Sequence, residues 1–206
     1  MTCPLCKSSS KLYFENIYYR CNNCLGIFKD EQFHLVGIDE KNIYDKHVNI
    51  ATDLRYQDFL SPITNSVMKD KKKNSIGLDF GCGKSSAIIE VLRNNNYKVE
   101  GYDLFYKNDL ELLETKYDYI TSSEVIEHFA NPKKEFELFL NLLKKDGSLY
   151  LMTDIFDENT TDFSKWYYKN DPTHIFMYQK KSFEYIKDTF NFKDLYINKR
   201  LIKLYL

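Results

Sequence analysis

The sequence has no long hydrophobic run. No stretch approaches the roughly 20 consecutive apolar residues that a transmembrane helix needs. The first ten residues, MTCPLCKSSS, also lack the apolar core of a secretory signal. These absences predict a cytoplasmic protein that has reduced thiols and makes no membrane contact.

The chain also lacks an excess of charge of either sign. Its 29 lysines and arginines nearly balance 30 aspartates and glutamates, which leaves a formal net charge of -1. Nothing here creates the global basic field that attracts nucleic acid or an anionic membrane. Internal repeats and low-complexity tracts are missing as well. With 206 residues, of which 43% are hydrophobic, the chain can hold one α/β domain and a small appendage.

Cysteine is scarce, but its few residues are not scattered. Four of the five cysteines form two C-x2-C pairs, Cys3, Cys6, Cys21 and Cys24. Two such knuckles supply the four thiolates of a tetrahedral zinc site. Two disulfides or a redox pair are the alternatives, and a reducing compartment disfavours them. We therefore predict a structural zinc ribbon over residues 1–30, with Lys11 to Arg20 as a strand and the metal supplying its stability.

The remainder of the chain divides into a connector and an α/β domain. Residues 31–72 form the connector, which is predicted to end in a lid helix from Asp53 to Lys69. From residue 73 to 206, strands and helices alternate at the spacing of a doubly wound parallel sheet. A loop of about 28 residues after Thr153 is too long to be a mere connection.

A glycine loop joins the first predicted strand of this domain to a helix. Asp79 closes the strand, and Gly81, Cys82 and Gly83 form a tight turn. Such a turn brings backbone N–H groups close to a nucleotide-like ligand. The third glycine of the dinucleotide fingerprint and the spacing of a Walker loop are both missing. A pyrophosphate or phosphate ligand is therefore disfavoured.

Ligands of doubly wound sheets bind at the carboxyl ends of the strands. The second strand ends in Asp103, about 20 residues after Gly83, where a carboxylate grips a ribose. The loops after strands one, two and four should line one crevice. The predicted cofactor-binding residues are Asp79, Gly81, Cys82, Gly83, Asp103, Leu104, Ser122, Ser123 and Glu124.

Four ordered segments resemble the class I S-adenosylmethionine-dependent methyltransferases: GLDFGCG, VEGYD, YDYITSSEVIEHFANP and LLKKDGSLYLMT. The resemblance covers nearly all of residues 75–206 and is closest to the ubiquinone-biosynthesis-type methylases. Within that subgroup, the chain resembles bacterial proteins that join a four-cysteine ribbon to a compact methyltransferase domain. The resemblance implies a Rossmann-like seven-stranded sheet and S-adenosylmethionine as cofactor. Only 14 residues separate Asp103 from Asp118, so the third strand is expected to be short or absent, and the adenine contacts stay open.

The same resemblance implies roles for individual residues. The glycine loop would approach the amino-acid part of the cofactor, oriented by Asp79 through backbone hydrogen bonds. Asp103 would accept both ribose hydroxyls, and Ser122 and Ser123 would border the sulfonium.

Methyl transfer requires alignment, removal of water and, for some acceptors, a base. His174, in the long loop with Asp171 nearby, is the candidate base, although an anchoring role for this histidine stays open. Tyr44 and His47 are candidates for the opposite side of the lid. The chain is thus predicted to methylate a small molecule or an envelope or secondary-metabolite precursor. The alternatives are an RNA methyltransferase whose ribbon holds nucleic acid and a non-catalytic binding module.

Overall fold

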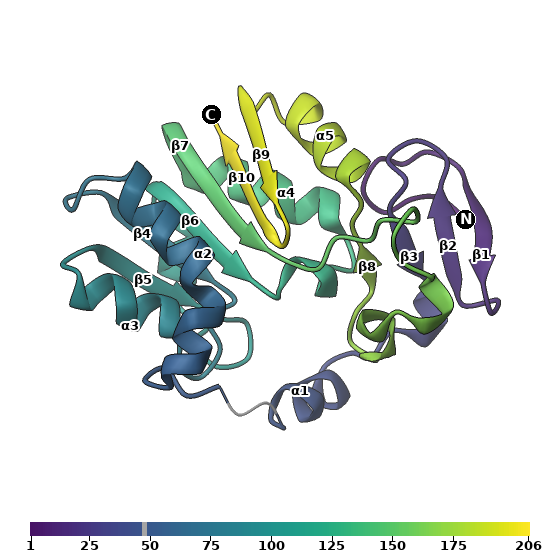
Figure 1. The fold of residues 1–206 in the computed structure, drawn as a ribbon, viewed down its shortest axis with the longest axis horizontal. Helices are drawn as coiled ribbons and strands as arrows, with labels where there is room; N and C mark the ends of the chain where they lie inside the picture. Colours follow the sequence, from purple (N-terminus) through teal and green to yellow (C-terminus); the bar gives the residue numbers. More distant parts are fainter. Residues whose placement is uncertain (47–48) are drawn as a thin grey trace.

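The computed structural model describes residues 1–46 and 49–206, which form two β-sheets with helices around the larger one (Figure 1). The larger sheet has six strands in the order β5-β4-β6-β7-β10-β9. Their bounds are β4 (Ile76–Phe80), β5 (Lys98–Tyr102), β6 (Tyr117–Ser123), β7 (Leu143–Met152), β9 (Asp194–Asn198) and β10 (Leu201–Tyr205). The first four are parallel, and β10 runs antiparallel to both β7 and β9.

This is the predicted Rossmann-like methyltransferase sheet, with the third strand missing. Between β5 and β6 the chain forms a 3-10 helix, η2 (Leu110–Glu114), in place of a helix and a strand. The prediction of a compact sheet is confirmed. The central strands are buried on both faces, as expected for parallel strands covered by helices.

Helices cover both faces of the large sheet. The pair α2 (Leu54–Asp70) and α3 (Ala87–Asn94) packs on one face, where Leu60, Ile63 and Val67 recur at helical spacing on the buried side of α2. The pair α4 (Pro132–Leu142) and α5 (Lys180–Thr189) packs on the other face, within the larger hydrophobic core. Every described helix is too short or too polar to cross a membrane.

The smaller sheet is built mainly from the N-terminal residues. Its strands are β1 (Ser10–Phe14), β2 (Tyr18–Cys21), β3 (Ile27–Lys29) and β8 (Phe176–Met177), in the order β1-β2-β3-β8. The predicted single strand from Lys11 to Arg20 was wrong. Glu15 and Asn16 adopt left-handed backbone angles, so the segment turns back on itself as a hairpin.

Three other segments carry structure that the sequence pattern did not reveal. The connector contains η1 (Glu31–Phe33) and α1 (Ile38–Tyr44). The long loop after β7 contains η4 (Phe163–Lys165), η5 (Tyr167–Asn170) and the strand β8, and η3 (Ile126–His128) follows β6. The loop after β7 packs against the N-terminal sheet through an aromatic cluster that includes Tyr18, Phe163 and Trp166.

Candidate functional site

A cavity of about 1130 Å³ opens where β4, β5 and β6 end. Its walls come from the loops after these strands, from α1 and α2, from the segment 167–174 and from Arg200. Seven of the predicted cofactor-binding residues line it: Gly81, Cys82, Gly83, Asp103, Leu104, Ser123 and Glu124. The candidates Tyr44, Asp171 and His174 line it as well. His47 lies outside the described residues.

Asp79 and Ser122 are buried behind the wall of this cavity. The carboxylate of Asp79 accepts hydrogen bonds from the hydroxyls of Ser86, at 2.6 Å, and Thr121, at 2.7 Å. Ser86 also caps α3, because its hydroxyl accepts the N–H of Ile89 at 3.1 Å. Through Ser86, Asp79 therefore connects β4 to α3 after the glycine loop, and through Thr121 it connects β4 to β6, in place of the expected backbone hydrogen bonds. Burial raises the pKa of Asp79 to about 6.

Two glycines shape the turn after β4. Gly81 has a φ of 80°, and a β-carbon there would lie 2.4 Å from the side chain of Val125. Gly83 has a φ of 62°, and a β-carbon there would meet no atom within 4 Å. Only glycine adopts this left-handed backbone without cost. The loop thus packs tightly on one side and leaves open space beside Gly83, which suits a ligand that approaches the backbone.

Asp103 organises the loop that faces the glycine turn. Its carboxylate accepts the backbone N–H groups of Gly83 at 2.9 Å, Phe105 at 2.8 Å and Tyr106 at 3.1 Å. An ionised carboxylate offers about four acceptor positions, so room remains for one hydroxyl. A ligand that presents two hydroxyls would displace one of the loop N–H groups.

The end of α1 is fastened over this side of the cavity. The carboxylate of Asp45 binds the ammonium groups of Lys84, at 2.7 Å, and Lys41, at 2.9 Å, and accepts the Tyr106 hydroxyl at 2.8 Å. The next residue inward, Tyr44, donates to Glu40 at 2.7 Å and packs against the ring of His128. The connector therefore lines this side of the cavity with residues of α1 as well as of the predicted helix α2.

His174 faces the cavity from the opposite wall. Its Nδ1 lies 2.6 Å from the backbone carbonyl of Tyr168. Because a carbonyl can only accept, Nδ1 carries the proton and Nε2 keeps a free lone pair. This Nε2 lies 4.0 Å from a carboxylate oxygen of Glu127 and 3.9 Å from one of Asp171. Burial, helped by the nearby His128, lowers the pKa of His174 to about 4, so the ring is neutral at pH 7.

Asp171 steadies its own turn more than it steadies the imidazole. Its carboxylate accepts the backbone N–H of Thr173 at 2.8 Å and the hydroxyl of the same residue at 2.5 Å. The carbonyl of Tyr168, in place of the predicted Asp171, sets the orientation of the His174 ring.

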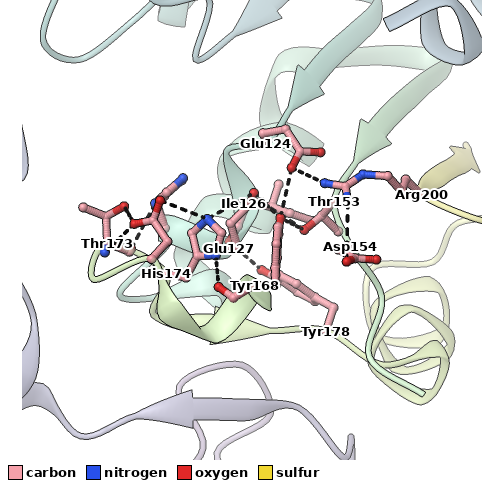
Figure 2. Close-up of polar contacts among 12 residues, drawn as sticks. Glu124, Ile126, Glu127, Thr153, Asp154, Tyr168, Thr173, His174, Tyr178 and Arg200 are labelled. Atoms are coloured by element: carbon pink, nitrogen blue, oxygen red, sulfur yellow. Dashed lines mark hydrogen bonds and ion pairs between the residues drawn. The ribbon is translucent and has the colours of Figure 1, made fainter. Parts of the chain in front are cut away.

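A charged network lies beside this histidine (Figure 2). Glu124 accepts hydrogen bonds from Arg200 and from the Tyr168 hydroxyl, and Arg200 also pairs with Asp154 at 3.5 Å. The same Tyr168 hydroxyl also contacts the fully buried Glu127, so its single proton is shared between the two carboxylates. Burial raises the pKa of Glu124 and of Glu127 to about 7.

Sequence reasoning missed Arg200, and sheet topology could have found it. Arg200 lies in the turn between β9 and β10, and its carbonyl accepts the N–H of Thr153, which follows β7. The turn therefore lies at the same edge of the sheet as the carboxyl ends of the parallel strands.

The four N-terminal cysteines fit a metal ion. Their sulfur atoms lie within 4.8 Å of one another, with 3.6 Å between Cys3 and Cys24 and 3.2 Å between Cys6 and Cys21. These distances are too long for disulfides, whose sulfurs are about 2.0 Å apart. Four thiolates about 2.3 Å from zinc lie roughly 3.8 Å from one another, which is close to the observed spacing.

A second group of donor atoms, from Glu127, His128 and His174, also lies within 4.8 Å. Its members could surround an ion, but they already have protein partners. The Glu127 carboxylate accepts two hydroxyls, and each histidine Nδ1 faces a backbone carbonyl.

Residues 44–197 match the family described as a methyltransferase domain. No curated protein matches the chain in sequence.

Solved structures of methyltransferases share the fold. A SAM-dependent methyltransferase from Archaeoglobus fulgidus is 21% identical, with 68% of this chain and 71% of that one covered and a TM-score of 0.53. Human N-acetylserotonin methyltransferase in complex with SAM is 14% identical, with 74% of this chain and 54% of that one covered and a TM-score of 0.53. Magnesium protoporphyrin IX methyltransferase from Synechocystis PCC 6803, with bound SAM, is 16% identical, with 85% of this chain and 93% of that one covered and a TM-score of 0.50. The chain thus spans about half the length of the human enzyme.

Proposed function

The chain belongs to the family of methyltransferase domains, and from this premise we propose that it transfers the methyl group of S-adenosylmethionine to a small-molecule acceptor. The observation that carries the proposal is the arrangement of the cavity. The glycine turn and Asp103 form one wall, and a neutral histidine with a free Nε2 forms the other. Its volume of about 1130 Å³ leaves room for a cofactor and a compact acceptor together.

Each wall has its own task in this reaction. S-adenosylmethionine, when bound, supplies an activated methyl group that needs no further activation by the protein. The turn at Gly81 to Gly83 would hold the amino-acid part of the cofactor, and Asp103 would hold a ribose hydroxyl. The unpartnered, buried hydroxyl of Ser123 would face the sulfonium end.

His174 would act on the acceptor. Its Nε2 would take the proton of an acceptor O–H or N–H group as the acceptor atom bonds to the methyl carbon, with the methyl–sulfur bond breaking and its electron pair staying on the sulfur of the departing thioether. The Tyr168 carbonyl holds Nδ1–H in place, and the carboxylates of Glu127 and Asp171, at about 4 Å, would stabilise the resulting imidazolium.

A small acceptor is favoured over RNA because the ribbon is engaged elsewhere. Strand β3 pairs with β8, and Arg20 forms a two-pronged ion pair with Glu158 at 2.7 and 2.8 Å. These contacts occupy an edge strand and a guanidinium group that could otherwise bind phosphates. Together with the formal net charge of -1, these contacts leave few basic groups to bind the phosphates of a nucleic acid.

Cofactor binding and acceptor class can be tested together. We expect S-adenosylmethionine to raise the melting temperature of the protein, because a ligand that binds only the folded state stabilises it. With labelled cofactor, methyl transfer should occur to small molecules with hydroxyl or amino groups and not to ribosomal RNA fragments. The absence of a thermal shift would contradict the proposal, and salt-sensitive methylation of RNA would favour the alternative.

We further propose that the four cysteines hold a structural zinc ion, which makes residues 1–30 a zinc ribbon. We also propose that the protein is cytoplasmic, because these thiols stay reduced there. The subgroup to which we propose it belongs is that of the ubiquinone-biosynthesis-type methylases. Support comes from the sulfur spacing and from the burial of Cys3, Cys21 and Cys24.

Purified protein is expected to contain one equivalent of zinc, and removal by a chelator should lower the melting temperature by 10 °C or more, on the order of 3–5 kcal/mol. The Cys82→Ser variant should keep its zinc, whereas Cys24→Ser should lose it. Protein that is free of zinc yet equally stable would disprove the structural role.

A further inference from the structure

The last strand of the ribbon is hydrogen-bonded to the segment that carries His174. Strand β3 pairs antiparallel with β8, with Ile27 opposite Met177 and Phe28 opposite Phe176. The backbone N–H of Lys29 extends this pairing by donating to the carbonyl of Ile175 at 2.9 Å. Figure 1 shows β8 lying between the ribbon and the rest of the molecule. The ribbon thus reaches the residue next to the candidate base.

The side chain of Lys29 also connects the ribbon to the segment that carries His174. Only 6% of this residue is exposed, and its ammonium group donates to the backbone carbonyl of Pro172 at 2.8 Å. A lysine is seldom buried to this extent without a specific partner. An apolar side chain would serve packing equally well at less cost in desolvation, so the ammonium group points to a specific role.

Other ribbon residues hold the long loop farther from the base. The hydroxyl of Tyr18 donates to the carbonyl of Lys169 at 3.0 Å, and Arg20 pairs with Glu158. Of these three contacts, that of Lys29 lies within the turn from Asp171 to His174. This turn has little regular structure of its own, since it lies between η5 and β8.

From these contacts we propose that Lys29 is a positioning residue for His174, so that the ribbon forms part of the methyl-transfer site. The inference rests on the proposed function. Lys29 binds the carbonyls on both sides of His174, at Pro172 through its side chain and at Ile175 through its backbone. The histidine between them, which lines the cavity, is thereby held in place from both sides. Because a shift of about 1 Å at a catalytic group can reduce the rate about 100-fold, such a clamp has a large effect on turnover.

The ammonium charge also acts on the imidazole. The groups that face His174 are Glu127 and His128 from η3, Tyr168 and Asp171 from the long loop and Lys29 from β3. The positive charge of Lys29 contributes to the lowered pKa of His174. Its removal should therefore raise that pKa and move the acid limb of the pH profile of kcat to higher pH.

The test compares Lys29→Met, which removes the ammonium group, with Lys29→Arg, which keeps a charge and a donor. Lys11→Met, at an exposed position on β1, is the control. For Lys29→Met we expect kcat to fall about 10- to 100-fold, with the acid limb shifted upward and the Kd for S-adenosylmethionine unchanged. The arginine variant should regain part of kcat and the original acid limb. Lys11→Met should behave as wild type.

Hydrogen exchange provides a readout that does not depend on turnover. In Lys29→Met, the amides of Asp171 and of residues 173–175 should exchange faster, whereas those of β4 to β6 should stay as protected as in the wild type. Unchanged exchange together with an unchanged kcat and pH profile would overturn the proposal. If Lys29→Met fails to fold, Lys29→Gln takes its place in both measurements. A wild type that binds no S-adenosylmethionine would refute the proposed function instead, while the exchange experiment would still test the clamp.

Discussion

Replacing Asp103 with asparagine is expected to weaken S-adenosylmethionine binding by about 100-fold, equivalent to roughly 3 kcal/mol. The carboxylate accepts three backbone N–H groups, and its remaining acceptor position would bind a ribose hydroxyl under the proposed function. The amide loses the charge and replaces one acceptor oxygen with a donor, so the loop must open or the hydroxyl lose its partner. Isothermal titration calorimetry of both proteins with the cofactor measures the difference.

The loop after β5 also offers a matched control. Asp109 caps η2 by accepting the N–H of Glu111 at 3.2 Å, and it does not line the cavity. Asp109→Asn should therefore bind the cofactor as the wild type does. Equal binding by Asp103→Asn would contradict the assignment of Asp103 to the ribose.

The His174→Gln variant should lose about 10²- to 10⁴-fold in kcat and keep its affinity for the cofactor. Glutamine can still donate to the Tyr168 carbonyl, but it offers no basic nitrogen to the acceptor. As the proposed base, His174 would act in its neutral form, and burial lowers its pKa to about 4. Wild-type kcat should therefore be retained down to about pH 5 and fall as the pH drops through about 4.

Steady-state kinetics over this pH range measure the effect on kcat, and calorimetry measures the effect on cofactor affinity. A His174→Gln enzyme that turns over at the wild-type rate would remove this residue as the base and leave it an anchor for its loop. An equal loss of cofactor affinity and kcat would point to a structural defect, which the melting temperature would reveal.

Much of the α/β domain could be predicted because its buried faces impose a period on the sequence. The predicted helix from Asp53 to Lys69 is observed as Leu54–Asp70, and the second strand, predicted to end in Asp103, is observed as Lys98–Tyr102. The helix α1 was missed because none of its residues is buried, so it shows no apolar period. The strand β8 has two residues and pairs with a strand about 150 positions earlier, a contact that no local pattern indicates.

The candidate site also has a part that the sequence could predict and a part that it could not. Residues that follow the parallel strands, such as Gly83 and Asp103, line the cavity because the topology brings these strand ends together. The partners of His174 depended on the path of a long irregular loop. Sequence distance suggested Asp171, whereas the structure shows the carbonyl of Tyr168 at its Nδ1. The proposed role of Lys29 depends on how residues 1–30 pack against the long loop, which no local pattern indicates.

The most direct test of methyl transfer in this cavity is a crystal structure of the protein with S-adenosylhomocysteine. We expect the ribose of this product to bind Asp103, its amino-acid part to lie along Gly81 to Gly83, and its sulfur to face the space in front of Nε2 of His174. A product bound outside this cavity, or with its sulfur turned away from His174, would contradict the proposed site and mechanism.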